Sequence, residues 1–96
     1  MTTKELHSKE VSSLCRKYHV HTLSMFGSMA RGEARAESDI DLLVSFSEPV
    51  TLLQLAAFER ELSTILGRKV DLVTEASISP YLRKQILQEQ RPVYDA

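Results

Sequence analysis

The chain has 96 residues, with 12 Lys plus Arg against 13 Asp plus Glu and a single cysteine. This length suits one hydrophobic core, so we expect residues 1–96 to form one domain. The balanced charge gives no broad basic surface and argues against direct nucleic-acid binding, and one cysteine excludes an internal disulfide. Because no leader-like or long apolar segment appears, we expect a soluble cytoplasmic protein without membrane association.

The N-terminal segment is predicted to be an amphipathic helix. Thr2 and Glu5 have the spacing of a capping box, and apolar residues follow at helical intervals over 11–18. This pattern predicts a helix whose apolar side packs on a sheet. Cys15 lies on that side, so we interpret it as a packing residue and not as a nucleophile.

A strand that ends in a glycine turn comes next. Residues 20–26 alternate as a strand and stop at Gly27, where glycine permits a tight turn. Ser28 can then cap a short helix through Arg31, and such a helix start offers backbone N–H groups to an anion. Gly27 and Ser28 are therefore candidate phosphate-binding residues. Arg31 could neutralise phosphate charge or could pair with a neighbouring acid.

The following strand opens with two acids. Asp39 and Asp41 alternate with the apolar residues that start at Ile40, so both carboxylates lie on the face opposite the apolar one. Their Cα atoms are expected to lie roughly 6.6 Å apart, at ~3.3 Å rise per residue. Like charges this close repel unless a cation lies between them. Mg²⁺ fits, because it takes oxygen ligands and shares its shell with substrate phosphates.

A second helix is predicted between this strand and the next. Thr51 and Gln54 have capping-box spacing, and an apolar stripe continues until Gly67 ends the helix. The helix serves as the crossover between two strands. If both strands lie in one sheet, the right-handed crossover makes them parallel.

Asp71 is the candidate third acid. It lies in a short β-branched run, residues 69–73, on the face opposite Val70 and Leu72. Two-metal phosphoryl-transfer sites usually need a further carboxylate beside the first pair. If this strand lies beside the Asp39 strand, all three acids share one face of the sheet.

The C-terminal part is predicted to add one helix and one strand. Ser79 and Pro80 supply a cap and a proline at the first helical position, and residues 92–94 form a brief edge strand. With the preceding segments, this order predicts an α/β (α+β) chain.

The motifs together resemble the DNA polymerase β-type nucleotidyltransferases, and most closely their minimal nucleotidyltransferase (MNT) branch. The resemblance rests on Phe26-Gly27-Ser28, Ala30-Arg31-Gly32 and Ser38-Asp39-Ile40-Asp41. It implies a small mixed β-sheet flanked by helices, a two-ion Mg²⁺ site, and transfer of a nucleoside monophosphate from a nucleoside triphosphate. By position, it implies that Gly27 and Ser28 bind the triphosphate, that Asp39 and Asp41 hold metal, and that Asp71 is the third catalytic acid.

The resemblance also implies a partner and an acceptor. MNT proteins of this size are usually antitoxins encoded beside a HEPN-domain ribonuclease toxin, and members with this motif transfer AMP from ATP to a tyrosine of that toxin. The alternative is a non-catalytic antitoxin that neutralises the toxin by binding alone. A nucleotidyltransferase for a small molecule or RNA is disfavoured, because the length leaves no room for an acceptor-binding domain.

Overall fold

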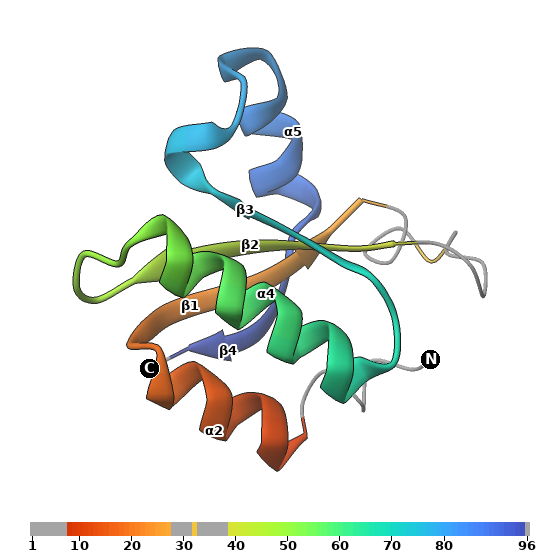
Figure 1. The fold of residues 1–96 in the computed structure, drawn as a ribbon. Helices are drawn as coiled ribbons and strands as arrows, with labels where there is room; N and C mark the ends of the chain where they lie inside the picture. Colours follow the sequence, from red (N-terminus) through yellow and green to blue (C-terminus); the bar gives the residue numbers. More distant parts are fainter. Residues whose placement is uncertain (1–7, 28–31, 33–38, 96) are drawn as a thin grey trace.

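The computed structural model describes residues 8–27, 32 and 39–95. Four strands form one sheet in the order β3-β2-β1-β4 (Figure 1). β1 is antiparallel to β2 and β4, whereas β2 and β3 are parallel, as the crossover predicted. The mixed sheet flanked by helices confirms the expected fold class. The elements in chain order are α2 (Lys9–Lys17), β1 (Val20–Phe26), β2 (Ile40–Phe46), α4 (Leu52–Leu66), β3 (Val70–Thr74), the 3₁₀ helix η1 (Glu75–Ser77), α5 (Pro80–Glu89) and β4 (Arg91–Asp95).

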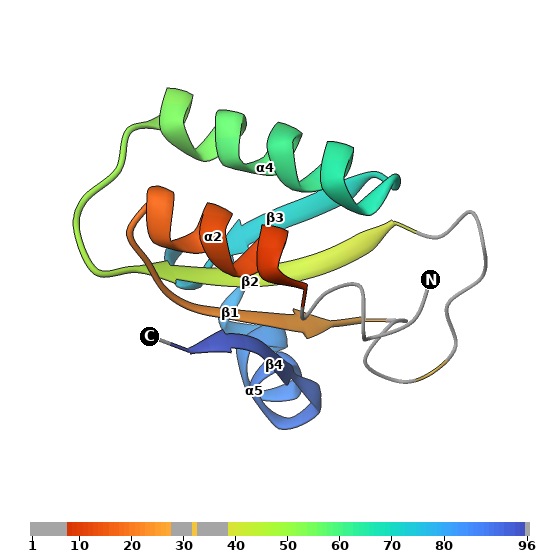
Figure 2. The same cartoon turned by 90° about the horizontal axis from the view of Figure 1, so that it is seen from below.

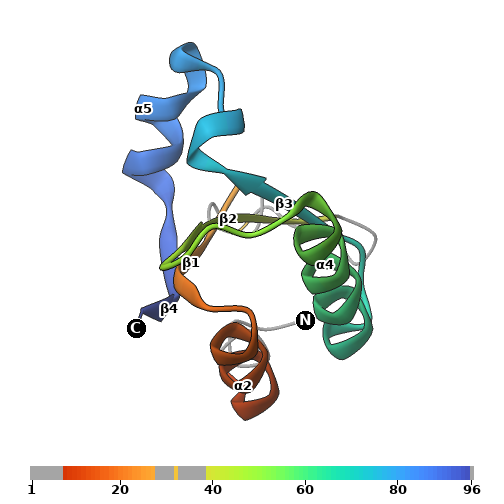
Figure 3. The same ribbon diagram turned by 60° about the vertical axis from the view of Figure 1, so that its left-hand side comes forward.

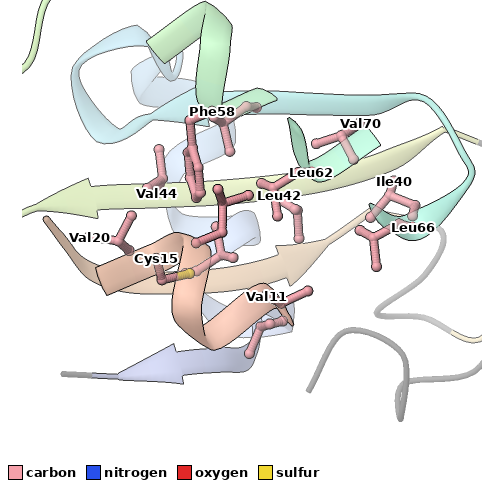
Figure 4. Close-up of a cluster of buried hydrophobic side chains, with 14 of the residues drawn as sticks. Val11, Cys15, Val20, Ile40, Leu42, Val44, Phe58, Leu62, Leu66 and Val70 are labelled. Atoms are coloured by element: carbon pink, nitrogen blue, oxygen red, sulfur yellow. The ribbon is translucent and has the colours of Figure 1, made fainter. Parts of the chain in front are cut away.

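The hydrophobic core lies on one side of the sheet. Helices α2 and α4 cover this side, and α5 lies on the other (Figure 2 and Figure 3). Alternate residues of the strands point towards α2 and α4, where they meet the apolar stripes of both helices (Figure 4). The fully buried members include Val11, Cys15, Leu23, Ile40, Leu42, Val44, Phe58, Leu62 and Val70. Residues between these on the strands must therefore face α5.

The N-terminal helix differs from its expected bounds. α2 begins at Lys9, and Ser8 caps it by accepting a hydrogen bond from the Val11 N–H at 3.4 Å. Ser8 has an extended backbone, with φ −67° and ψ 161°, so one continuous helix through this residue is not present. The expected start at Thr2 lies outside the described residues. The apolar stripe is confirmed, because Cys15 on it is fully buried.

Helix α4 has the caps that the sequence predicts. The Gln54 N–H donates to the Thr51 hydroxyl at 3.1 Å, and the Thr51 N–H donates to the Gln54 side-chain oxygen at 2.8 Å. Gly67 ends the helix in the left-handed conformation, with φ +66°, and its N–H donates to the Ser63 carbonyl. The helix therefore begins and ends where local chemistry places its boundaries.

Strand β3 is an edge strand whose outer N–H groups bond to side chains. The Val70 N–H donates to the Ser63 hydroxyl at 3.1 Å, and the Leu72 N–H donates to the Glu59 carboxylate at 3.3 Å. Both acceptors come from α4. Because an exposed strand edge is open to pairing with another chain, these bonds protect the edge and fix β3 beside β2. They thereby hold Asp71 in register.

Candidate functional site

The parallel pairing of β2 and β3 places Asp41 directly beside Asp71 in register. The flanking residues of both strands are buried in the core, so the two aspartates project from the opposite face, towards α5. Asp41 is half-buried and Asp71 is exposed. Neighbouring strands lie about 4.8 Å apart, which allows both carboxylates to bind one ligand.

A cavity of about 360 Å³ contains both carboxylates. It lies between the sheet and the segment formed by η1 and α5, so residues from both halves of the chain contribute to it. Its other walls are mostly apolar, with two serine hydroxyls, which is the usual composition of a small-molecule site. These walls are formed by Phe26, Val73, Ser77, Ile78, Ser79, Leu82 and Ile86. Sequence patterns identified α5 as a helix but gave no signal that it closes over the acidic strands.

Gly27 is in close contact with Asp41. Its φ of +70° lies in the left-handed region that favours glycine. A Cβ at this position would lie 3.2 Å from the carboxyl carbon of Asp41 and nearer still to its Oδ2. The absence of a side chain at Gly27 therefore leaves room for the Asp41 carboxylate. A triphosphate-binding role for Gly27 stays a prediction.

Glu89, the last residue of α5, also reaches this turn. The Gly27 N–H donates to Glu89 Oε1 at 3.2 Å. Sequence analysis missed this residue, because a contact across 62 positions leaves no periodic or spacing signal. The Asp41 carboxylate thus lies against the Cα of Gly27, and the Glu89 carboxylate binds the Gly27 N–H.

Asp39 lies apart from the cavity. Its side chain is about half exposed, and its Oδ2 lies 3.8 Å from Lys69 Nζ. The Ile40 N–H donates to the Lys69 carbonyl at 2.9 Å, which brings the start of β2 beside the start of β3. An exposed ion pair of this length is weak and can open when a ligand binds.

Asp41 and Asp71 are the two carboxylates that could bind a divalent cation in the cavity. Across residues 8–27, 32 and 39–95, no three acidic, histidine or cysteine side chains gather closely enough to hold a metal ion by themselves. Asp41 and Asp71 nevertheless offer the paired carboxylate oxygens that Mg²⁺ takes, and Mg²⁺ normally completes its shell with water and substrate phosphates. The donor set fits a Mg²⁺ site of that open kind. Ser28 and Arg31 lie outside the described residues, so their roles stay predictions.

Cys15 can be set aside as a nucleophile. Burial raises the pKa of its thiol from 9.0 to about 12, so the thiol is neutral at ordinary pH. The nucleophilic form of cysteine is the thiolate. This confirms the packing role.

The sequence is similar to proteins of a known family. Residues 7–93 match the family model described as a nucleotidyltransferase domain. The chain belongs to this nucleotidyltransferase family. A protein of Methanocaldococcus jannaschii assigned as a protein adenylyltransferase is 46% identical over 84 residues, which cover 86% of each chain. The protein adenylyltransferase MntA of Thermococcus cleftensis is 40% identical over 83 residues, covering 86% of this chain and 81% of MntA.

Solved structures show the same fold. A protein assigned to the minimal nucleotidyltransferases is 42% identical, with a TM-score of 0.81 and 96% of each chain covered. A chain of a toxin–antitoxin crystal structure with AMP-PNP has a TM-score of 0.77 at 21% identity, covering 100% of this chain and 75% of its own length. A chain of the complex between a tri-AMPylated Shewanella oneidensis HEPN toxin and its MNT antitoxin has a TM-score of 0.72 at 20% identity, covering 99% and 74%. The resemblance to the minimal nucleotidyltransferases is thus confirmed.

The structure describes helices of 3 to 15 residues. None of them is both long enough and apolar enough to cross a membrane.

Proposed function

We propose that this protein is a Mg²⁺-dependent protein adenylyltransferase that transfers AMP from ATP to a tyrosine hydroxyl of a co-encoded HEPN-domain toxin, and thereby acts as an antitoxin. The observation that carries the proposal is the pairing of Asp41 with Asp71 in one cavity, beside the Gly27 turn. Relatives at 40% identity and above carry the name of protein adenylyltransferase. A neighbour in fold comes from a complex with an AMPylated HEPN toxin.

The three aspartates have distinct roles in this proposal. Asp41 and Asp71 would hold Mg²⁺, with Asp39 joining them after its weak contact with Lys69 opens. When bound, Mg²⁺ offsets charge on the phosphates and lowers the pKa of an oxygen that it contacts. Asp71 is exposed and therefore accessible to an acceptor from another protein.

The transfer step is a displacement at the α-phosphorus of ATP, with Asp71 as the proton acceptor. The acceptor oxygen forms a bond to the α-phosphorus of ATP while the bond from that phosphorus to the bridging oxygen breaks, and pyrophosphate leaves. Asp71 accepts the proton of the attacking hydroxyl. The apolar walls of the cavity, among them Ile78 and Leu82, provide a surface that can hold the nucleoside. Positioning and charge supply most of the catalysis.

Exposed apolar side chains support a protein partner. Leu52 and Leu53 at the start of α4 are 84% and 83% exposed, and Tyr81 at the start of α5 is 93% exposed. Contiguous exposed apolar side chains mark surfaces that contact another protein, and Leu52 and Leu53 are neighbours in the chain. Tyr81 lies two residues after Ser79, which forms part of the cavity wall, so a partner that covers Tyr81 would lie close to the site.

The experiment mixes the purified protein, Mg²⁺-ATP and the HEPN-domain protein encoded beside it, and then measures the intact mass of both proteins. A mass gain of one or more adenylates on the neighbour, mapped to tyrosine, supports the proposal. A stable complex without any mass gain supports the binding-only antitoxin. If the experiment gives neither a mass gain nor a stable complex, the acceptor is a different molecule and the proposal is contradicted. Asp95→Asn, which changes an exposed acid at the far end of β4, is the matched control for Asp41→Asn and Asp71→Asn.

A further inference from the structure

Glu89 connects the last helix to the glycine turn of the site. It is half-buried at the C-terminal end of α5, and its carboxylate accepts the Gly27 N–H at 3.2 Å. Gly27 is also the residue whose missing side chain leaves space for Asp41. The Glu89 carboxylate therefore binds the backbone of Gly27, and the position of that backbone limits where the Asp41 carboxylate can lie.

Gly27 lies beyond the paired part of β1. The last pair between β1 and β2 in the described residues is Phe26 with Asp41, and the last pair between β1 and β4 is Met25 with Arg91. Glu89 comes just before β4 and supplies an acceptor for the Gly27 N–H where no β4 residue does. A charged acceptor makes a hydrogen bond stronger than a neutral acceptor does. The turn is thus tied to α5 by this side chain.

The position of Glu89 is unfavourable for the helix itself. A carboxylate in the last turn faces the negative end of the helix dipole, and cations are favoured there instead. Alanine is also a better helix former than glutamate. Both local effects of Glu89 on α5 are therefore unfavourable, whereas its bond to the Gly27 N–H stabilises the turn.

The geometry points to Glu89 as a positioning residue for nucleotide binding: its carboxylate fixes the Gly27 turn and, through that turn, the Asp41 carboxylate. The inference rests on the proposed function, since it concerns the same site. Loss of the carboxylate releases the turn, and small displacements of positioned groups cost on the order of 10- to 100-fold in rate or affinity.

The test compares Glu89→Ala, Glu89→Gln and Glu89→Asp with Gln88→Ala as the control, because Gln88 is exposed on the same helical turn and forms no wall of the cavity. The measurements are the Kd for AMP-PNP with Mg²⁺ by calorimetry, kcat/KM for AMP transfer, and the melting temperature. We expect Glu89→Ala to weaken AMP-PNP binding on the order of 10-fold or more, while the melting temperature falls only by the small amount that the loss of one partly exposed hydrogen bond causes. Glu89→Gln, which keeps an acceptor oxygen in place, should stay within about threefold of the wild type.

The outcomes distinguish several explanations. Unchanged AMP-PNP affinity in Glu89→Ala overturns the inference, and tighter binding overturns it as well, because it would mean that the carboxylate competes with phosphate. If Glu89→Ala does not fold, Glu89→Asp decides in the same way, since it keeps the charge but shortens the reach. If the wild type binds AMP-PNP but transfers no AMP, the proposed function fails while the affinity comparison still decides the role of Glu89. If the wild type binds no AMP-PNP, both are wrong.

Discussion

The Asp41 carboxylate lies against the backbone of Gly27, in the space that a side chain at Gly27 would fill. A Cβ there would lie 3.2 Å from the Asp41 carboxyl carbon. Phe26 and Asp41 are also paired across β1 and β2. The conformation of the Gly27 turn and the position of the Asp41 side chain therefore depend on each other. A substitution at either residue should change both the turn and the acid.

We predict that Gly27→Ala reduces AMP transfer on the order of 10²-fold or more, because Asp41 or the turn must move to admit the methyl group. The matched control is Gly67→Ala. Gly67 has nearly the same φ, +66° against +70°, but apart from its own chain neighbours and nearby helix backbone no atom of the described residues lies within 4 Å of a Cβ added there. The control should lose about 1 kcal/mol of stability and keep its activity. Transfer rates of the two folded variants, measured side by side, check this. Equal losses of activity in both variants would mean that the contact with Asp41 has no role.

Asp41→Asn and Asp71→Asn should each lower transfer on the order of 10²-fold or more, because they remove charge from the site while keeping side-chain shape. Their melting temperatures should stay close to that of the wild type. Initial rates with Mg²⁺-ATP and thermal unfolding of each variant are the measurements. Full activity in Asp71→Asn would contradict its assignment as the acid that takes the acceptor proton.

The bonds from α4 to the edge of β3 should contribute to stability. Glu59→Ala removes the acceptor of the Leu72 N–H, and Ser63→Ala removes that of the Val70 N–H. Each change is expected to cost about 1 kcal/mol, since water can reach part of this edge and replace the lost bond. Urea unfolding gives the values, and Glu59→Gln, which keeps an acceptor oxygen, should lose less. Losses no larger than that of Arg60→Ala, an exposed neighbour on α4, would show that the edge bonds do not stabilise β3.

The free energy of unfolding should fall as pH rises above 9.0. Burial raises the pKa of Cys15 from 9.0 to about 12, so above pH 9.0 the unfolded thiol loses a proton that the folded one keeps. This group lowers stability by at most about 1.4 kcal/mol per pH unit until its folded pKa is reached. The pKa of Tyr18 is also raised, mainly by the hydrogen bond from its hydroxyl to Glu61. This group therefore lowers the free energy of unfolding further at higher pH. Urea unfolding at rising pH measures the slope, which should be shallower in Cys15→Ala. An equal slope in that variant would assign the decline to other groups.

Local patterns predicted most of the fold, because the forces behind them act between near neighbours. The capping box of Thr51 and Gln54 and the proline at the start of α5 both lie where the sequence places them. The first helix was predicted less well, because the extended backbone of Ser8 interrupts the expected single helix, while the expected start at Thr2 lies outside the described residues. In the described residues, Ser8 caps the helix.

The candidate site was predicted in part. Alternation along β2 and β3 correctly placed Asp41 and Asp71 on one face, and the crossover helix correctly made the strands neighbours. The cavity walls from α5 and the bond from Gly27 to Glu89 could not be predicted, because they depend on how the C-terminal helix packs over the sheet. The contact of Asp39 with Lys69 likewise depends on the stagger of two strand ends.

Binding of Mn²⁺, as a paramagnetic substitute for Mg²⁺, tests the central claim most directly. In a two-dimensional NMR spectrum with AMP-PNP present, we expect the amide signals of Gly27, Asp41 and Asp71 to broaden first as Mn²⁺ is added. The signal of Gly67 should stay sharp, and Asp41→Asn should need more Mn²⁺ for the same broadening. Broadening that begins elsewhere, with the signals of Asp41 and Asp71 unchanged, would contradict a metal-dependent nucleotide site at these two aspartates.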